Sequence, residues 1–87
     1  MFTVYILYSF KHDKVYTGYT SNLLERFKSH NFLGKNNWTC RYRPWVVIYI
    51  EYFDEKTAAI SREKELKSGK GREWIKQNIE EWKIPFS

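Results

Sequence analysis

Several carboxylates in the sequence could take part in phosphodiester hydrolysis as ligands of a metal ion. Those on segments predicted as helices or strands are Glu25, Glu51, Glu63, Glu65 and Glu73. A single carboxylate can hold Mg²⁺, because this ion keeps several of its waters and needs few protein ligands. Phosphodiester hydrolysis needs such a cation together with a positioned proton acceptor. Spacing selects none of the five, and each could equally belong to a solvated face.

Four tyrosines lie on the predicted strands, Tyr5, Tyr8, Tyr16 and Tyr19. A phenol is a poor base at its reference pKa of about 10. Neighbouring cations would lower that pKa and make a phenol useful in proton transfer. Without such neighbours, these rings are ordinary aromatics of a core or sheet.

Arg26 and His30 are four residues apart and therefore share one face of a predicted helix. Together they could bind a phosphate and transfer a proton, or they could be solvent-exposed charged residues without a function. His12 and His30 are too few and too far apart in sequence to indicate a metal cluster. The single cysteine, Cys40, excludes a disulfide framework and a cysteine-rich zinc site.

Two further segments have the composition of phosphate or nucleic-acid binders. The residues SGKGR at 68–72 combine backbone amides, two cations and a helix start, without the spacing of a Walker A loop. The residues WTCRYRPW at 38–45 interleave aromatic rings with arginines, as single-strand binders do. The alternatives are a basic turn between helices and a loop folded back on the sheet.

The charge distribution favours a polyanionic partner. The net charge is +5, and residues 1–50 hold seven Lys and Arg against two acidic residues, whereas residues 51–87 are balanced. A cationic half suits nucleic acid better than an acidic protein or a lipid surface. The N-terminus has neither a bilayer-spanning run nor the pattern of a signal peptide, so we expect a reduced, cytoplasmic protein without a membrane partner. The length of 87 residues predicts one domain over 1–87.

The elements that position these residues follow from periodicity and turn signals. The predicted order is ββαβαα, an α+β fold. The expected segments are strands over 2–9, 15–20 and 45–53, helices over about 22–30, 55–68 and 72–82, and a long loop over 31–44. Ser21 or Asn22 would cap the first helix and Asp54 the second, while Gly69 would end the second helix as its C′ residue. The first two strands form an antiparallel hairpin.

The ordered set of motifs resembles the GIY-YIG nuclease family, and in particular its small single-domain members. The resemblance rests on T-V-Y at 3–5, Y-T-G at 16–18, Asn22, Arg26, His30 and Glu63, and extends from Thr3 to about Lys76. It implies a three-stranded antiparallel sheet flanked by helices. It also implies hydrolysis of phosphodiester bonds that depends on Mg²⁺ or Mn²⁺. Thr3 and Thr17 depart from the family pattern, but both tyrosines are retained.

The resemblance also implies roles for particular residues. Tyr5 and Tyr16 would contact the scissile phosphate or help to activate water, with pKa values depressed by the divalent ion and the arginine. Arg26 would stabilise the charged transition state, His30 would aid proton transfer or contact the phosphate, and Glu63 would be the metal ligand. Gly18 would allow a close backbone approach beside the site. Asn78 matches a late-helix asparagine of some relatives too loosely to be included.

The resulting hypothesis is a metal-dependent endonuclease acting on DNA rather than RNA, in DNA repair or processing. It would work as a monomer, with a protein partner for targeting as an option. The residues expected to contact nucleic acid are Gly18, Lys28, Arg41, Arg43, Lys67, Lys70 and Arg72. Two alternatives stay open at this point. One is a non-catalytic nucleic-acid-binding module with the same fold, and the other is an interaction subunit that docks a partner through Trp74 and Trp82.

Overall fold

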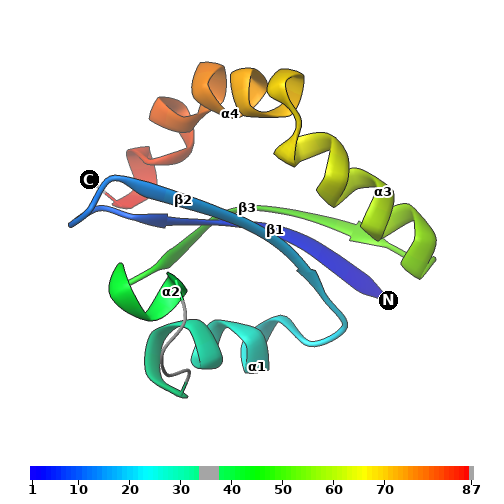
Figure 1. Ribbon diagram of the computed structural model, residues 1–87, viewed down its shortest axis with the longest axis horizontal. Helices are drawn as coiled ribbons and strands as arrows, with labels where there is room; N and C mark the ends of the chain where they lie inside the picture. The colour runs from blue at the N-terminus through cyan, green and yellow to red at the C-terminus, as the bar shows by residue number, and fades with distance from the viewer. Residues whose placement is uncertain (34–37, 87) are drawn as a thin grey trace.

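A three-stranded antiparallel sheet lies between two layers of helices, with α1 and α2 on one face and α3 and α4 on the other (Figure 1). The computed structural model describes residues 1–33 and 38–86. The elements are, in chain order, β1 (Phe2–Ser9), β2 (Lys14–Thr20), α1 (Leu23–Lys28), the π-helical turn η1 (Ser29–Leu33), α2 (Trp38–Arg41), β3 (Val46–Phe53), α3 (Lys56–Lys67), α4 (Gly69–Trp82) and the 3-10 turn η2 (Ile84–Phe86). The predicted α+β class, the order ββαβαα and the antiparallel sheet are confirmed, with α2 as an addition.

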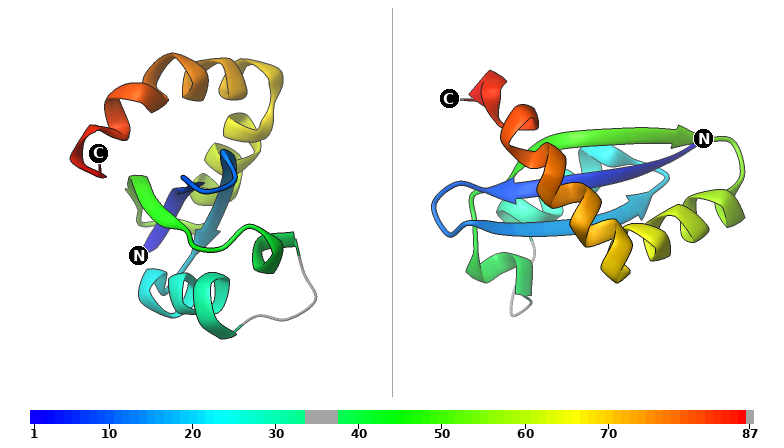
Figure 2. Two further views of the ribbon diagram at one scale, coloured as in Figure 1. Left: turned by 90° about the vertical axis from the view of Figure 1, so that its left-hand side faces the viewer. Right: turned by 90° about the horizontal axis from the view of Figure 1, so that it is seen from above.

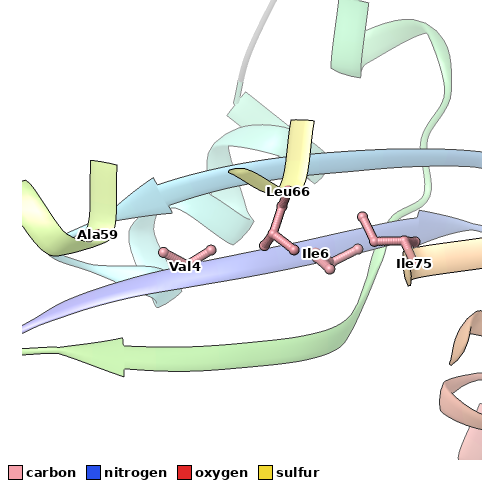
Figure 3. Packing of buried hydrophobic residues seen from close by; sticks show 5 residues of the cluster. All are labelled: Val4, Ile6, Ala59, Leu66 and Ile75. Atoms are coloured by element: carbon pink, nitrogen blue, oxygen red, sulfur yellow. The ribbon is translucent and has the colours of Figure 1, made fainter. Parts of the chain in front are cut away.

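The central strand β1 is covered on both faces, as its apolar sequence predicts. The strand order is β2-β1-β3, so β1 pairs on both sides. Val4 and Ile6 point toward α3 and α4 and pack with Ala59, Leu66 and Ile75 (Figure 3). Alternation along a strand sends the intervening side chains to the opposite face, where Tyr5 and Leu7 pack with Trp45. The sheet thus separates two apolar cores. Figure 2 shows the helices that lie over the two faces of the sheet.

Helix α1 begins as predicted, but the segment after it is more ordered than a long loop. The Asn22 side chain caps α1 by accepting a hydrogen bond from the Glu25 backbone N–H at 3.1 Å. The expected loop over 31–44 contains the rest of η1 and the short helix α2, and residues 34–37 of it lie outside the described residues. The third strand starts at Val46 rather than Trp45, because the Trp45 backbone bonds with the Asn31 side chain at 2.6 and 3.1 Å.

The start of α3 and the junction with α4 differ from the sequence-based expectation. Glu55, not Asp54, occupies the N-cap of α3, and no side chain caps that end. Helix α4 begins at Gly69 instead of Arg72, because the Ser68 hydroxyl accepts a hydrogen bond from the Gly71 backbone N–H at 3.2 Å. Gly69 is therefore not a left-handed C′ residue, and none of the glycines that the structure describes has a positive φ.

No helix within residues 1–33 and 38–86 is both long and apolar enough to cross a membrane.

Candidate active site

A polar cavity of about 330 Å³ opens at the free edge of β2, where the two helical layers approach the same strand. It collects Tyr5 from β1, Tyr16 and Gly18 from β2, Arg26 from α1 and Glu63 from α3. These residues are far apart in the sequence and come from four elements. The structure therefore places four of the five predicted catalytic side chains around one cavity.

Tyr5 owes its position to the glycine opposite it. The antiparallel register pairs Tyr5 with Gly18. A Cβ built on Gly18 would lie 2.5 Å from the Tyr5 hydroxyl oxygen and 2.8 Å from its Cζ, closer than real side chains approach. Glycine at this position is what lets the end of the phenol lie close to the backbone of β2. The close approach expected at Gly18 is thus made by the protein's own tyrosine.

His30, the fifth predicted residue, lies behind the tyrosines. It is buried in η1, and its Nε2 is 2.9 Å from the Tyr5 hydroxyl oxygen. The His30 and Tyr16 ring centroids are 4.8 Å apart, and those of Tyr5 and Tyr16 are 6.2 Å apart. His30 does not line the cavity itself, and its hydrogen bond with Tyr5 connects it to the lining.

The environment keeps Tyr5 protonated and His30 neutral. Burial, reinforced by the neighbouring Tyr16, raises the pKa of Tyr5 well above its usual value, although Arg26 opposes the shift. Burial also lowers the pKa of His30, and the positive charges of Arg26 and Arg43 lower it further. A neutral imidazole has one acceptor nitrogen, and the His30 tautomer that carries its proton on Nδ1 accepts the Tyr5 proton at Nε2.

The protein's own groups therefore do not activate Tyr5 as the sequence led us to expect. We expected an arginine and a divalent ion to depress the phenol pKa. In the structure desolvation of the buried ring outweighs Arg26, and the shift of the Tyr5 pKa is upward. Tyr5 can still relay a proton when His30 carries its own proton on Nδ1, since Nε2 is then an acceptor for the Tyr5 hydroxyl.

The structure also distinguishes Glu63 from the other carboxylates. Arg62 binds Glu51 at 2.9–3.1 Å and also bonds with Glu65, so both of these acids are engaged away from the cavity. Glu25 and Glu73 are exposed on α1 and α4 and do not line it. Only Glu63, among the five candidates that the sequence offered, faces the tyrosines and Arg26.

Glu63 fits a site for a hard divalent ion that keeps most of its water shell. Its side chain is 18% exposed, and it pairs with Lys67 at 3.5 Å. Within the described part of the chain, no three His, Cys, Asp or Glu side chains gather into a group able to hold a metal. One carboxylate beside a polar cavity is nevertheless enough for Mg²⁺, whose remaining positions are taken by water and substrate phosphate.

The cations expected to contact nucleic acid are spread over both helical layers. Lys28 and Arg41 are exposed at the ends of α1 and α2, on one face of the sheet. Lys70 and Arg72 are exposed in the first turn of α4, on the other face. Lys67 lies nearest the cavity, because it pairs with Glu63.

Arg43 has a role inside the fold that its sequence context did not indicate. Its guanidinium donates to the His30 carbonyl at 2.5 Å and to the Ser29 carbonyl at 3.1 Å. It thereby ties the segment before β3 to η1 and holds a positive charge near the His30 ring. We therefore leave Arg43 out of the nucleic-acid surface proposed below.

Lys56 lines the cavity but was not singled out from the sequence. It begins α3, seven residues before Glu63. Seven residues are two helical turns, so both side chains project from one face of the helix. This spacing was the available signal, and it becomes informative only once Glu63 is recognised as a site residue.

Comparison with known proteins agrees with this geometry. A family model described as the GIY-YIG catalytic domain matches residues 1–78. A UPF0213 protein from Staphylococcus haemolyticus is 38% identical over 71 residues, which cover 82% of this chain and 85% of that protein. UPF0213 proteins from Haloquadratum walsbyi and Streptococcus pyogenes are 38% and 46% identical, over 64% and 67% of this chain. Each of these two matches spans 63% of the relative's length. No solved structure gives a significant match.

Proposed function

The chain belongs to the GIY-YIG catalytic domain family, and from this premise we propose that it is an endonuclease that hydrolyses phosphodiester bonds in DNA with Mg²⁺ or Mn²⁺. The observation that carries the proposal is the meeting of Tyr5, Tyr16, Arg26 and Glu63 around one cavity. Family membership supports a nuclease in general terms. The metal, the preference for DNA and a role in DNA repair or processing are our inferences.

In this proposal Arg26 and Tyr16 hold the scissile phosphate. Arg26 is exposed at the cavity, and a guanidinium can donate two parallel hydrogen bonds to phosphate oxygens. It also faces the negative charge that grows on these oxygens as water attacks. Removing one such preorganised donor from an enzyme slows the reaction by about 10²–10³-fold. The Tyr16 hydroxyl adds a neutral donor from the edge of the sheet.

Tyr5 and His30 move the proton. With His30 protonated on Nδ1, the attacking water gives a proton to the Tyr5 oxygen while the proton of Tyr5 passes to His30 Nε2, 2.9 Å away. The water oxygen bonds to phosphorus, the bond to the leaving oxygen breaks, and that oxygen takes a proton from solvent. This relay needs no phenolate before the reaction, which agrees with a Tyr5 pKa that burial raises.

Glu63 would hold the divalent ion. When bound, such an ion polarises a phosphoryl oxygen as a Lewis acid. Before it binds, Lys67 balances the Glu63 charge at 3.5 Å, and a surface pair of this kind is weak enough to be displaced. We propose a monomer as the active form, with every group of this scheme supplied by one chain.

The test is a cleavage assay on end-labelled single-stranded, duplex and flap DNA and on single-stranded RNA, each with Mg²⁺, Mn²⁺ or EDTA. Arg26→Gln, purified identically, reveals any contaminating nuclease. Lys64→Gln is the matched control, because Lys64 is an exposed cation on α3 that does not line the cavity. We expect products only with a divalent ion, at least about 10²-fold fewer with Arg26→Gln, and an unchanged rate with Lys64→Gln.

Two results would contradict the proposal. Equal cleavage by the protein and by Arg26→Gln would mean that this cavity is not the active site. Salt-sensitive binding of DNA without products under any condition would favour the non-catalytic binding module instead.

A further inference from the structure

A second and larger hollow, of about 620 Å³, adjoins the candidate active site. It lies between β2, the short helix α2 and the α3–α4 layer, and Tyr16 lines both hollows. We call it the α4 groove, defined by Tyr16, Trp38, Lys67, Arg72, Ile75 and Lys76. The chemistry proposed above does not use Trp38, Arg72, Ile75 or Lys76.

One wall of the α4 groove is an exposed tryptophan held in place by other rings. Trp38 is 42% exposed. Its ring centroid lies 5.8 Å from that of the buried Trp45 and 4.8 Å from that of Tyr42. Trp45 is itself anchored by a hydrogen bond from its indole N–H to the Thr39 carbonyl at 2.8 Å. Trp38 is thus a supported aromatic surface at the groove rather than a ring packed into the core.

The floor of the α4 groove is apolar and its cations outnumber its acids. Ile75 is a core residue whose side chain also faces the groove. Lys67, Arg72 and Lys76 contribute three exposed positive charges. Among the described residues of the lining, the one acid is Asp13, which accepts a hydrogen bond from Tyr8 at 2.6 Å. An apolar hollow bordered by cations is complementary to a ligand with a flat apolar body and a phosphate backbone.

We infer that the α4 groove binds an unpaired stretch of the substrate strand next to the scissile phosphate, with one base stacked on Trp38 and flanking phosphates on Arg72 and Lys76. The inference rests on the proposed nuclease function, because it places the strand relative to that site. A duplex keeps its bases stacked inside the helix and presents phosphates and groove edges. An apolar floor beside a tryptophan suits a base that is not paired.

The test measures binding without catalysis, by fluorescence anisotropy in EDTA, with labelled twelve-nucleotide oligo(dT) and a twelve-base-pair duplex. Stacking on one aromatic ring contributes roughly tenfold or more in affinity. We expect Trp38→Ala to weaken binding of the single strand at least about tenfold, and Trp38→Phe to restore most of it. The duplex should bind equally to all three proteins. Tyr52→Ala, which removes an exposed ring from β3, should change nothing.

The phosphate contacts have a separate readout. Replacing both Arg72 and Lys76 by Gln should reduce the slope of log Kd against log salt for oligo(dT) by about 1.4, because each cation contributes about 0.7 on a single strand. Lys64→Gln, outside the groove, should leave this slope unchanged.

The inference is overturned if Trp38→Ala binds oligo(dT) as the unchanged protein does, or if it loses duplex binding equally. If the protein still shows metal-dependent cleavage in that case, the nuclease proposal is unaffected and only the inference about the α4 groove is refuted. Absence of both binding and cleavage on every substrate would refute the proposed function, and the inference with it.

Discussion

Gly18→Ala is the substitution that the geometry of the site predicts most sharply. The added methyl would lie 2.5 Å from the Tyr5 hydroxyl oxygen and 3.1 Å from Cε2 of Tyr16, whereas ordinary contact begins near 3.4 Å. The Tyr5 oxygen must therefore retreat by about 0.9 Å to restore ordinary contact. The Tyr5 oxygen is already 2.9 Å from His30 Nε2, and Tyr5 as a whole is only 1% exposed, so the surrounding residues oppose this movement.

The expected effect on stability is moderate and the effect on activity is large. Overpacking of a core costs about 1–3 kcal/mol, and a weakened hydrogen bond about 0.5–1.5 kcal/mol. The smaller entropy of the unfolded alanine chain offsets about 0.4–1 kcal/mol. We expect the free energy of unfolding to fall by about 1–3 kcal/mol. For a chain of this length, each kcal/mol lowers Tm by roughly 4–8 °C. Misplacing a catalytic group by about 1 Å should slow cleavage about 10²-fold.

The assay compares Tm and single-turnover cleavage for Gly18→Ala and Gly69→Ala. Gly69 is the matched control, because a Cβ there meets nothing within 4 Å. It should leave cleavage unchanged and Tm equal or slightly higher. In a Tyr5→Phe background, Gly18→Ala should cost less stability, since the nearest clashing atom is gone. Full stability and full activity of Gly18→Ala would refute the packing argument.

Two other predictions follow from the structure. Because the folded His30 has a pKa below its usual 6.5, the unfolded chain binds more protons as the pH falls through that value. The free energy of unfolding should therefore decrease as the pH falls below about 6.5. In chemical denaturation between pH 7.5 and 5.5, His30→Gln should show a smaller decrease. Equal slopes of unfolding free energy against pH for the two proteins would contradict this prediction. Arg62→Met breaks the pairing with Glu51 and the stacking of Arg62 on Trp74 at 5.1 Å. It should cost about 1–2 kcal/mol and leave cleavage intact, and a selective loss of cleavage would show that Arg62 belongs to the site.

Local sequence signals predicted most of the fold. The two-sided apolar pattern of β1 and the cap at Asn22 depend on neighbouring residues, and both are confirmed. One failure depends on a contact between distant residues, and another on a local cap that the sequence analysis did not assign. The Trp45 backbone leaves the sheet because Asn31 provides its hydrogen bonds. Helix α4 starts early because Ser68 caps it.

The candidate site was predictable as a set of residue types but not as an arrangement. Arg62 engages Glu51 and not Glu63, and sequence spacing does not connect Arg62 to a particular acid. The direction of the Tyr5 pKa shift depends on burial, which the presence of a nearby arginine does not reveal. Arg43 likewise donates hydrogen bonds to two η1 carbonyls, thirteen and fourteen residues away in the sequence. Its neighbours in the sequence do not indicate these contacts.

The most direct test of the proposed active site is the rate of single-turnover cleavage by Glu63→Gln as a function of Mg²⁺ concentration. Glu73→Gln is the matched control, since Glu73 is an exposed carboxylate on α4 that lines neither hollow. We predict a loss of at least about 10²-fold for Glu63→Gln, with unchanged Tm and unchanged DNA binding in EDTA, and a normal rate for Glu73→Gln. Cleavage by Glu63→Gln at the normal rate and the normal Mg²⁺ requirement would contradict the assignment of this cavity as the active site.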